Sequence, residues 1–416
     1  MNYDCGFMSV ERRKKLQKNF ARMFWIRAFL HIKIINSVLS LFYIHRGLSM
    51  AELLYVGLFW AVGNFLFEIP SSYLADKWGR KRTIILGIVV MAVSWAVLLF
   101  AQGFLWVALS LFLNGVSYAC FSGTDTALIY DTKKELSGEK DSLRELGRFS
   151  SAFSVFKIFT VVIGAYLARD LLPWQFNLLI SIDFAGTLAA LIFASRLVEA
   201  HHIMDVESQE AGVMRDAIKI FKKYPILLRA ILNKELMFYA SFITWAYYQK
   251  FYFDMGLSII VIGAGWSIHH LFNFLAHRYS QKIFPRLSLT RKIDRLNIIS
   301  AAIIFLVLAA WFLKLPALII YIIYCCQSVA QVARRPMFDE FFNKHSHSFN
   351  RATTLSLANL LHNVIEFPML ILAGFLISKH VIYPYVMALV IGILVLSFAR
   401  LPKINPARIN SKLVYE

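Results

Sequence analysis

The sequence predicts an all-α membrane protein, with twelve transmembrane helices arranged as two pseudo-symmetric bundles of six. Three observations predict this fold: the composition, the spacing of apolar segments and a repeat between the halves. Of the 416 residues, 58% are hydrophobic and 17% are charged, and the mean hydropathy is +0.59. Soluble domains are about half apolar and a quarter charged, so the composition excludes an ordinary soluble enzyme and a disordered chain.

Apolar segments of about 20 residues, the length that crosses a bilayer, recur along the whole chain. They fall at 23–44, 51–74, 83–102, 104–127, 149–169, 174–195, 235–254, 258–280, 294–313, 317–338, 352–377 and 384–400. The polar segment 196–234 therefore separates two bundles at 23–195 and 235–400, and we expect it to be a cytoplasmic linker. The ends 1–22 and 401–416 are expected to be cytoplasmic tails.

The distribution of positive charge predicts the orientation. Of the 44 Lys and Arg residues, 36 fall on the side of the N-terminus and only four on the other side. This bias is typical of cytoplasmic loops, so both termini are predicted to be cytoplasmic. The net charge of +19 then reflects topology, and we expect the lipid bilayer and a small-molecule substrate as partners, with no nucleic acid.

The two halves repeat each other at an offset of 209 residues. Gly47-Leu48-Ser49 matches Gly256-Leu257-Ser258, and Asn64-Phe65-Leu66 matches Asn273-Phe274-Leu275. The matches open corresponding segments, the second and the eighth, at the same depth in each. Parallel repeats of six helices characterise one large class of transporters.

No pattern of catalytic residues competes with this interpretation. The four cysteines form no CxxC or Cys/His spacing, and no nucleophile elbow, phosphate-binding Gly-rich loop or HExxH sequence occurs. We therefore expect no enzyme activity, no metal and no cofactor, with transport driven by an ion gradient. The absence of an Asn-x-Ser/Thr sequence favours a bacterial membrane.

The loop between the second and third segments reads Ser72-Tyr73-Leu74-Ala75-Asp76-Lys77-Trp78-Gly79-Arg80-Lys81. It resembles the signature loop of the major facilitator superfamily, Gly-x-x-x-Asp-Arg/Lys-x-Gly-Arg/Lys-Arg/Lys. The match holds at Asp76, Lys77, Gly79, Arg80 and Lys81 and fails at Ser72, where the family has glycine. Gly79 suits a tight turn. The resemblance implies that Asp76 caps the N-terminus of helix eleven, which starts near Arg351, and so closes the cytoplasmic side like a latch.

Two departures from the family restrict what the resemblance implies. The second copy of the loop is eroded, because the offset places Pro285 opposite Asp76 and Ser288 opposite Gly79. The arginine motif of helix four is missing around Asn114, and so is the Gly-Pro motif of antiporters in helix five. Exchange of drugs for protons therefore does not follow from the resemblance.

Ionisable side chains inside membrane segments cost roughly 2.5–3.5 kcal/mol each on insertion scales, which makes them functional candidates. In the family, helices one, four, seven and ten line the cavity. The cavity candidates are Arg27, His31, Lys33, Asn36, Asn114, Lys157, His269, Gln327 and Glu366, and the candidates for proton coupling are Glu366, Glu68 and Asp125.

Several of these residues allow more than one interpretation. A stripe of Lys33, Asn36, Ser37 and Ser40 at helical spacing is favoured over the Arg27 and His31 face as the lining of the cavity. Glu68 is as well suited to pairing with Arg27 as to transport. Asp183 is expected to make a structural hydrogen bond, and Lys250 to pair with Asp254 one turn away.

The offset also places Lys157 opposite Glu366. We predict that both face the central cavity, Lys157 attracting the substrate and Glu366 carrying the coupling proton or orienting a cationic group. The alternative is local pairing, of Glu366 with His362 and of Lys157 with a backbone carbonyl.

These residues predict a monomeric secondary transporter in the inner (cytoplasmic) membrane of a bacterium. The substrate is expected to be a small organic solute, favoured as anionic and polycarboxylate- or siderophore-like, and coupling to protons is expected. The alternatives are efflux of amphiphilic drugs by the same fold, and a transporter-like receptor or scaffold that moves nothing.

Overall fold

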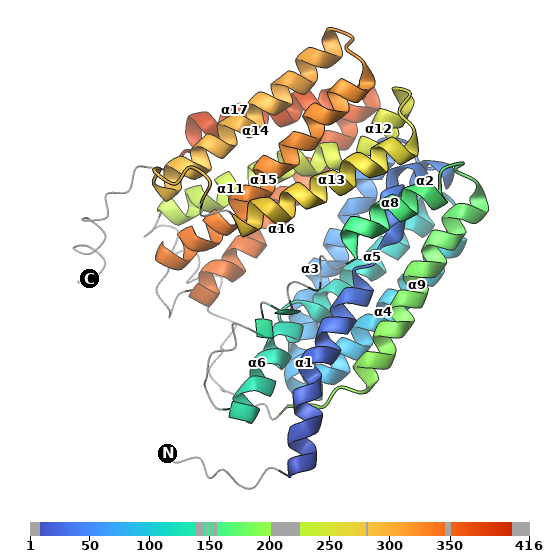
Figure 1. Ribbon diagram of the computed structural model, residues 1–416, viewed down its shortest axis with the longest axis vertical. Helices are drawn as coiled ribbons and strands as arrows, with labels where there is room; N and C mark the ends of the chain where they lie inside the picture. The colour runs from blue at the N-terminus through green and yellow to red at the C-terminus, as the bar shows by residue number, and fades with distance from the viewer. Residues whose placement is uncertain are drawn as a thin grey trace, which may run out of the picture. The chain divides into compact units, whose positions relative to one another are not determined.

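The computed structural model describes residues 9–137, 145–146, 148–149, 152, 156–200, 225–279, 282–345 and 351–401, and Figure 1 shows them as helices joined by short connections. No strand occurs in these ranges. The chain divides into two units, Met1–Glu207 and Ser208–Glu416. The predicted tails and the predicted linker lie partly outside the described residues.

Unit 1 contains one 3-10 helix, η1, and eight described α-helices. Their bounds are α1 Val10–Leu30, η1 Ile34–Ser37, α2 Leu39–His45, α3 Glu52–Trp78, α4 Arg80–Phe100, α5 Gly103–Phe121, α6 Thr124–Ser137, α8 Lys157–Leu167 and α9 Pro173–Ser195. In this unit α9 packs against both α1 and α4 (Figure 1). Their apolar faces form a core around Leu16, Met23, Ile26, Ile84 and Ile88.

Unit 2 contains seven described α-helices. Their bounds are α11 Pro225–Trp245, α12 Tyr248–Asp254, α13 Ile259–Arg278, α14 Leu289–Phe312, α15 Ala317–His345, α16 Arg351–Lys379 and α17 Tyr383–Phe398. A core in this unit gathers side chains of α11, α14 and α15, among them Ile231, Ile293 and Phe341.

Over their described residues, the predicted membrane segments coincide with helices or broken helices, and residues 150–151 and 153–155 of the segment 149–169 lie outside the described part. Segments 23–44, 104–127 and 235–254 are each divided into shorter helices. Seven helices among the described residues are long and apolar enough to cross a membrane, and Ile259–Phe272 and Tyr383–Phe398 are shorter apolar helices. The fold is therefore the predicted all-α membrane fold.

Three predicted helix starts were wrong. The first helix begins at Val10 instead of 23, the seventh at Pro225 instead of 235, and the ninth at Leu289 instead of 294. Residues 10–22 are polar but rich in good helix formers, and the Ser9 hydroxyl caps them by accepting a hydrogen bond from the Arg12 N–H at 3.2 Å. A hydropathy window detects the membrane segment but misses a polar extension of the same helix.

The helices α3 and α5 cross at close range because each presents a glycine to the other. A Cβ on Gly63 would lie 2.3 Å from the Phe112 carbonyl oxygen, and a Cβ on Gly115 would lie 2.1 Å from that of Trp60. Small residues at such crossings let helix backbones approach in a membrane, where apolar burial drives little association. The crossing lies on α3, whose last residues, 72–78, form the first part of the signature loop.

Gly115→Ala is expected to lower the free energy of unfolding by about 1–3 kcal/mol, because the added carbon overpacks the crossing. Thermal unfolding of the purified protein in detergent measures the change. Gly392→Ala is the matched control, since its Cβ would come no closer than 3.2 Å to the Ala301 Cβ. Equal losses in both variants would contradict the tight packing of the crossing at Gly115.

Candidate functional site

The first membrane segment is interrupted at the predicted cavity residues. The helix α1 ends at Leu30, and η1 and α2 follow after a gap that contains His31 and Lys33. Lys33 adopts a left-handed conformation with φ 39°, which is uncommon for a residue other than glycine. The prediction of a continuous polar stripe from Lys33 to Ser40 was therefore wrong, because these residues do not lie on one helix.

Asp183 of α9 stabilises this interruption. Its Oδ1 accepts a hydrogen bond from the Ile34 N–H at 2.8 Å, and its Oδ2 accepts one from the Ile35 N–H at 3.1 Å. Both N–H groups belong to the start of η1 and have no partner within that short helix. The predicted structural role of Asp183 is confirmed, although its partners are backbone groups of another segment.

Cationic side chains gather around the interruption. Lys33, Lys157 and Arg27 all act electrostatically on His31, and Lys33 and Lys157 repel each other. Lys157 is the first residue of α8, whereas the other three come from α1 and the residues after it. The structure thus brings together four predicted cavity residues of unit 1.

Arg27 pairs with Asp125 at the start of α6. The distance from Arg27 Nη1 to Asp125 Oδ2 is 3.4 Å, and the guanidinium lies 4.3 Å from the centre of the Phe149 ring. Glu68 instead accepts a hydrogen bond from the Ser122 hydroxyl at 3.2 Å. The suggested pairing of Glu68 with Arg27 was wrong, since the acid that reaches Arg27 comes from α6 and not from α3.

Unit 2 contains a cluster of titratable side chains between α11 and α16. Glu235 Oε2 lies 2.7 Å from His362 Nδ1, and the Tyr239 hydroxyl lies 3.0 Å from His362 Nε2. Glu366 follows His362 by one helical turn and also reaches the Tyr239 hydroxyl. Its Oε2 is buried without a hydrogen-bond partner. These four residues are called the α11–α16 acid cluster below.

The acid cluster corrects one predicted alternative. His362 does not pair with Glu366, because its ring is taken by Glu235 and Tyr239. Glu235 is buried, but it is the first residue of the predicted segment 235–254, where a charged side chain is ordinary and gives no signal of a site. A helix that starts at Pro225 places Glu235 almost three turns inside.

A buried arginine lies close to the same cluster. Arg334 of α15 donates from Nη1 to Asn297 Oδ1 at 2.5 Å, and Asn297 donates to Asn233 at 3.0 Å. The charge of Glu235 acts on Arg334. Sequence reasoning missed Arg334 because it lies near the end of a predicted segment, where positive charge is ordinary.

Three further predicted cavity residues bond to other helices of their own unit. Asn114 donates to Met91 Sδ at 2.9 Å, and Gln327 donates to the Ser241 hydroxyl at 3.3 Å. His269 Nδ1 lies 3.3 Å from the Cys325 carbonyl oxygen. None of these three contacts involves a residue of the acid cluster. The predicted pair of Lys250 and Asp254 is confirmed at 2.5 Å.

The signature loop is held by an acid that follows α9. Gly79 has φ 98°, and the Glu199 carboxylate accepts hydrogen bonds from the N–H groups of Arg80 and Lys81 at 2.8 and 2.9 Å. A Cβ on Gly79 would lie 2.8 Å from Glu199 Oε2. Glu199 therefore caps the N-terminus of α4, and the predicted turn at Gly79 is confirmed.

Two further contacts complete the surroundings of the loop. The Arg80 guanidinium forms an ion pair with Asp131 of α6, and Arg12 of α1 donates to the Glu199 carbonyl oxygen at 3.2 Å. The contact predicted between Asp76 and the start of α16 would join the two units, and it stays a prediction.

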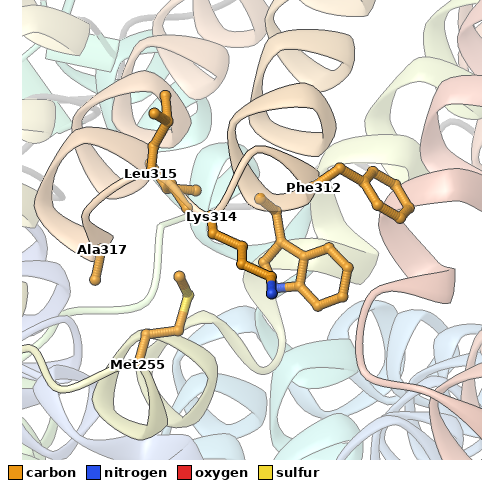
Figure 2. Close-up of a pocket in the computed structure, with 7 residues that line it drawn as sticks. Met255, Phe312, Lys314, Leu315 and Ala317 are labelled. Atoms are coloured by element: carbon orange, nitrogen blue, oxygen red, sulfur yellow. The ribbon is translucent and has the colours of Figure 1, made fainter.

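A hollow of about 450 Å³ lies at the connection between α14 and α15 (Figure 2). Met255, Phe312 and Lys314 are among the side chains around it. None of the predicted site residues lines this hollow. In addition, no group of three or more His, Cys, Asp or Glu side chains that could hold a metal occurs in the described part of the chain.

Broken helices with charged groups buried between them are typical of secondary transporters, which bind substrates near the middle of the membrane. The model of the Major Facilitator Superfamily matches residues 27–367 of this sequence. The chain belongs to the major facilitator superfamily, and it is accordingly a multi-pass membrane transporter and not an enzyme.

Solved structures of transporters share the fold. The nucleoside transporter NupG has a TM-score of 0.67 at 15% identity, covering 92% of this chain and 96% of that one. A D-xylose-proton symporter has a TM-score of 0.71 at 12% identity, covering 95% and 99%. A peptide transporter, POT, in complex with sulfate has a TM-score of 0.67 at 14% identity, covering 92% and 94%. At these identities the likeness shows the fold alone.

Glu199→Gln is expected to lower the free energy of unfolding by about 1 kcal/mol, because the N-terminus of α4 loses a charged cap. Thermal unfolding in detergent measures the loss. Glu52→Gln is the matched control, since Glu52 accepts a hydrogen bond from the Ser49 N–H in an exposed capping box. A smaller loss at Glu199 than at Glu52 would contradict its role as the support of the loop.

Proposed function

We propose that this protein is a proton-coupled secondary transporter for a small organic anion of the polycarboxylate or siderophore kind. It works as a monomer in the cytoplasmic membrane of a bacterium, with both termini in the cytoplasm. The strong bias of Lys and Arg toward one side of the predicted segments supports this orientation.

The observation that favours an anionic substrate is the cluster of cationic side chains in unit 1. Arg27, Lys33 and Lys157 lie within electrostatic reach of His31. Two acids lie nearby: Asp125 pairs with Arg27, and Asp183, whose two oxygens accept backbone N–H groups, attracts Lys33. The three cations therefore exceed the two acids by one. Positive charge in excess inside a membrane protein favours an anionic partner.

The acid cluster in unit 2 supports the coupling to protons. A proton moving through the membrane domain needs buried groups that gain and lose it, and carboxyl and imidazole groups do so near neutral pH. Glu366 is buried with one unbonded oxygen, and Glu235, His362 and Tyr239 connect it to the middle of α11. The D-xylose-proton symporter among the similar structures is an example of the fold working with protons.

Alternating access supplies the transport cycle. We propose that Asp76 caps the N-terminus of α16 when the cytoplasmic side is closed, and that it releases α16 when that side opens. The turn at Gly79 and the cap from Glu199 support this proposal, because they keep the end of α3 and the start of α4 in a fixed geometry.

Lys33→Gln and Lys157→Gln are each expected to weaken binding of an acidic substrate about tenfold, or ~1.4 kcal/mol, and to leave binding of a neutral analogue nearly unchanged. A thermal-shift screen of organic acids, siderophores and cationic drugs identifies the ligand and measures its affinity. Lys250→Gln, at the ion pair with Asp254, is the control. Equal losses for acidic and neutral ligands would point to an efflux pump for amphiphilic compounds.

Glu366→Gln is expected to abolish substrate accumulation driven by a pH gradient but to keep exchange of substrate for substrate across the membrane. Exchange is kept because it does not require the coupling residue to bind or release a proton. Uptake into proteoliposomes, with and without a pH gradient, separates the two activities. Glu68→Gln, at an acid bonded by Ser122, tests coupling in unit 1 in the same assay. Normal accumulation in a folded Glu366→Gln variant would remove Glu366 from the mechanism.

A further inference from the structure

The interruption of the first membrane segment has a cost that the surroundings must offset. Between α1 and η1 the helical hydrogen bonds lapse, and backbone groups left without partners in a membrane cost several kcal/mol each. Lys33 in the left-handed region adds strain of about 1–3 kcal/mol. Such a conformation persists only when neighbouring elements hold it in place.

Asp183 supplies the missing partners. Its two carboxylate oxygens accept hydrogen bonds from the consecutive N–H groups of Ile34 and Ile35, at 2.8 and 3.1 Å. These groups directly follow Lys33. A carboxylate in this position satisfies two backbone donors at once, and hydrogen bonds to a charged acceptor are stronger than neutral ones.

Two glycines allow the neighbouring helices to approach the interruption. A Cβ on Gly164 of α8 would lie 2.3 Å from Ser37 Oγ and 2.7 Å from the Ile34 carbonyl oxygen. A Cβ on Gly186 of α9 would lie 3.1 Å from Ile32 Cδ1. The interruption is therefore enclosed by α8 and α9, and its irregular backbone is buried in protein.

The second half of the chain lacks this arrangement. The corresponding break falls between α11 and α12, where the Ala246 N–H still donates to the Phe242 carbonyl oxygen at 3.0 Å. The 209-residue offset places Gly392 opposite Asp183. The break in unit 2 therefore forms without an acid at the position that corresponds to Asp183. The presence of Asp183 in unit 1 needs an explanation that is specific to unit 1.

Charge supplies a reason. Asp183 attracts the ammonium of Lys33, and Lys157 repels it. Because both Asp183 oxygens are bonded to the backbone and the side chain is buried, the acid stays beside Lys33. The residue that fixes the backbone around Lys33 therefore also fixes the direction of the field at its ammonium group.

We propose that Asp183 is a positioning residue, which holds the break in the first membrane segment so that Lys33 is presented to the anionic group of the substrate. The proposal rests on the anionic substrate proposed above. In this proposal Lys33 contacts the substrate and Asp183 does not. Asp183, on α9, determines the selectivity for anions indirectly, by fixing the backbone conformation at Lys33.

The test measures the access of Lys33 directly. Trinitrobenzenesulfonate is an anionic reagent that arylates neutral amines, and mass spectrometry of the modified protein gives its rate at each lysine. In the wild type, both Lys33 and Lys157 should react. In Asp183→Asn, the rate at Lys33 relative to Lys157 is expected to fall at least about fivefold. Removing the negative charge of Asp183 would by itself speed the reaction of Lys33 with an anionic reagent. A fall in the relative rate at Lys33 therefore shows that its amine has become less accessible.

Thr187→Val is the matched control. Thr187 is buried one turn from Asp183 on α9, and its hydroxyl donates only within that helix, to the Asp183 carbonyl oxygen at 3.0 Å. We expect its ratio of labelling to equal that of the wild type. Gly164→Ala provides a second route if Asp183→Asn fails to fold, because the added Cβ displaces the same backbone without a change of charge.

The outcomes separate this inference from the proposed function. An unchanged or increased ratio in a folded Asp183→Asn variant overturns the positioning role. Labelling of Lys157 but not of Lys33 in the wild type overturns it as well. Failure of the anionic reagent to reach either lysine in the wild type would instead contradict the cationic substrate site, and the positioning role with it.

Discussion

Every backbone N–H and C=O group in the hydrocarbon layer must find its partner inside the protein, and the interruption of the first membrane segment meets part of that constraint through one carboxylate. Asp183 bonds the two N–H groups that the interruption between α1 and η1 leaves open. The placement of Lys33, the close approach of α8 and α9, and the gathering of cations around His31 all depend on that interruption.

The two halves share a repeat but use their charges in opposite ways. Unit 1 gathers cations near the break in its first segment, whereas unit 2 places two buried acids, Glu235 and Glu366, between α11 and α16, with Lys234 and Arg334 beside Glu235. Lys157 and Glu366, which the 209-residue offset makes equivalent, belong to these two groups. In the proposed cycle, unit 1 binds the anion and unit 2 binds the proton. Two identical sites would not separate these two tasks.

The sequence predicts the parts of the structure that local chemistry decides. Membrane segments follow from runs of apolar residues, the turn at Gly79 from its need for a positive φ, and the pair of Lys250 and Asp254 from helical spacing. The interruption at Lys33 is not predictable in this way, because a hydropathy window averages over it. The partners of Arg27 and His362 also escape prediction, since they come from α6 and α11, far along the chain. Glu199 was missed because it follows the last segment of unit 1.

The central claim is that an organic anion and a proton cross the membrane together. Its most direct measurement uses the wild-type protein in liposomes that enclose a pH-sensitive dye, to which di- and tricarboxylates or their neutral amides are added. The account predicts that at least one carboxylate moves protons into the lumen and that no amide does. Equal proton movement with the amides, or transport of a carboxylate without any proton movement, would contradict it.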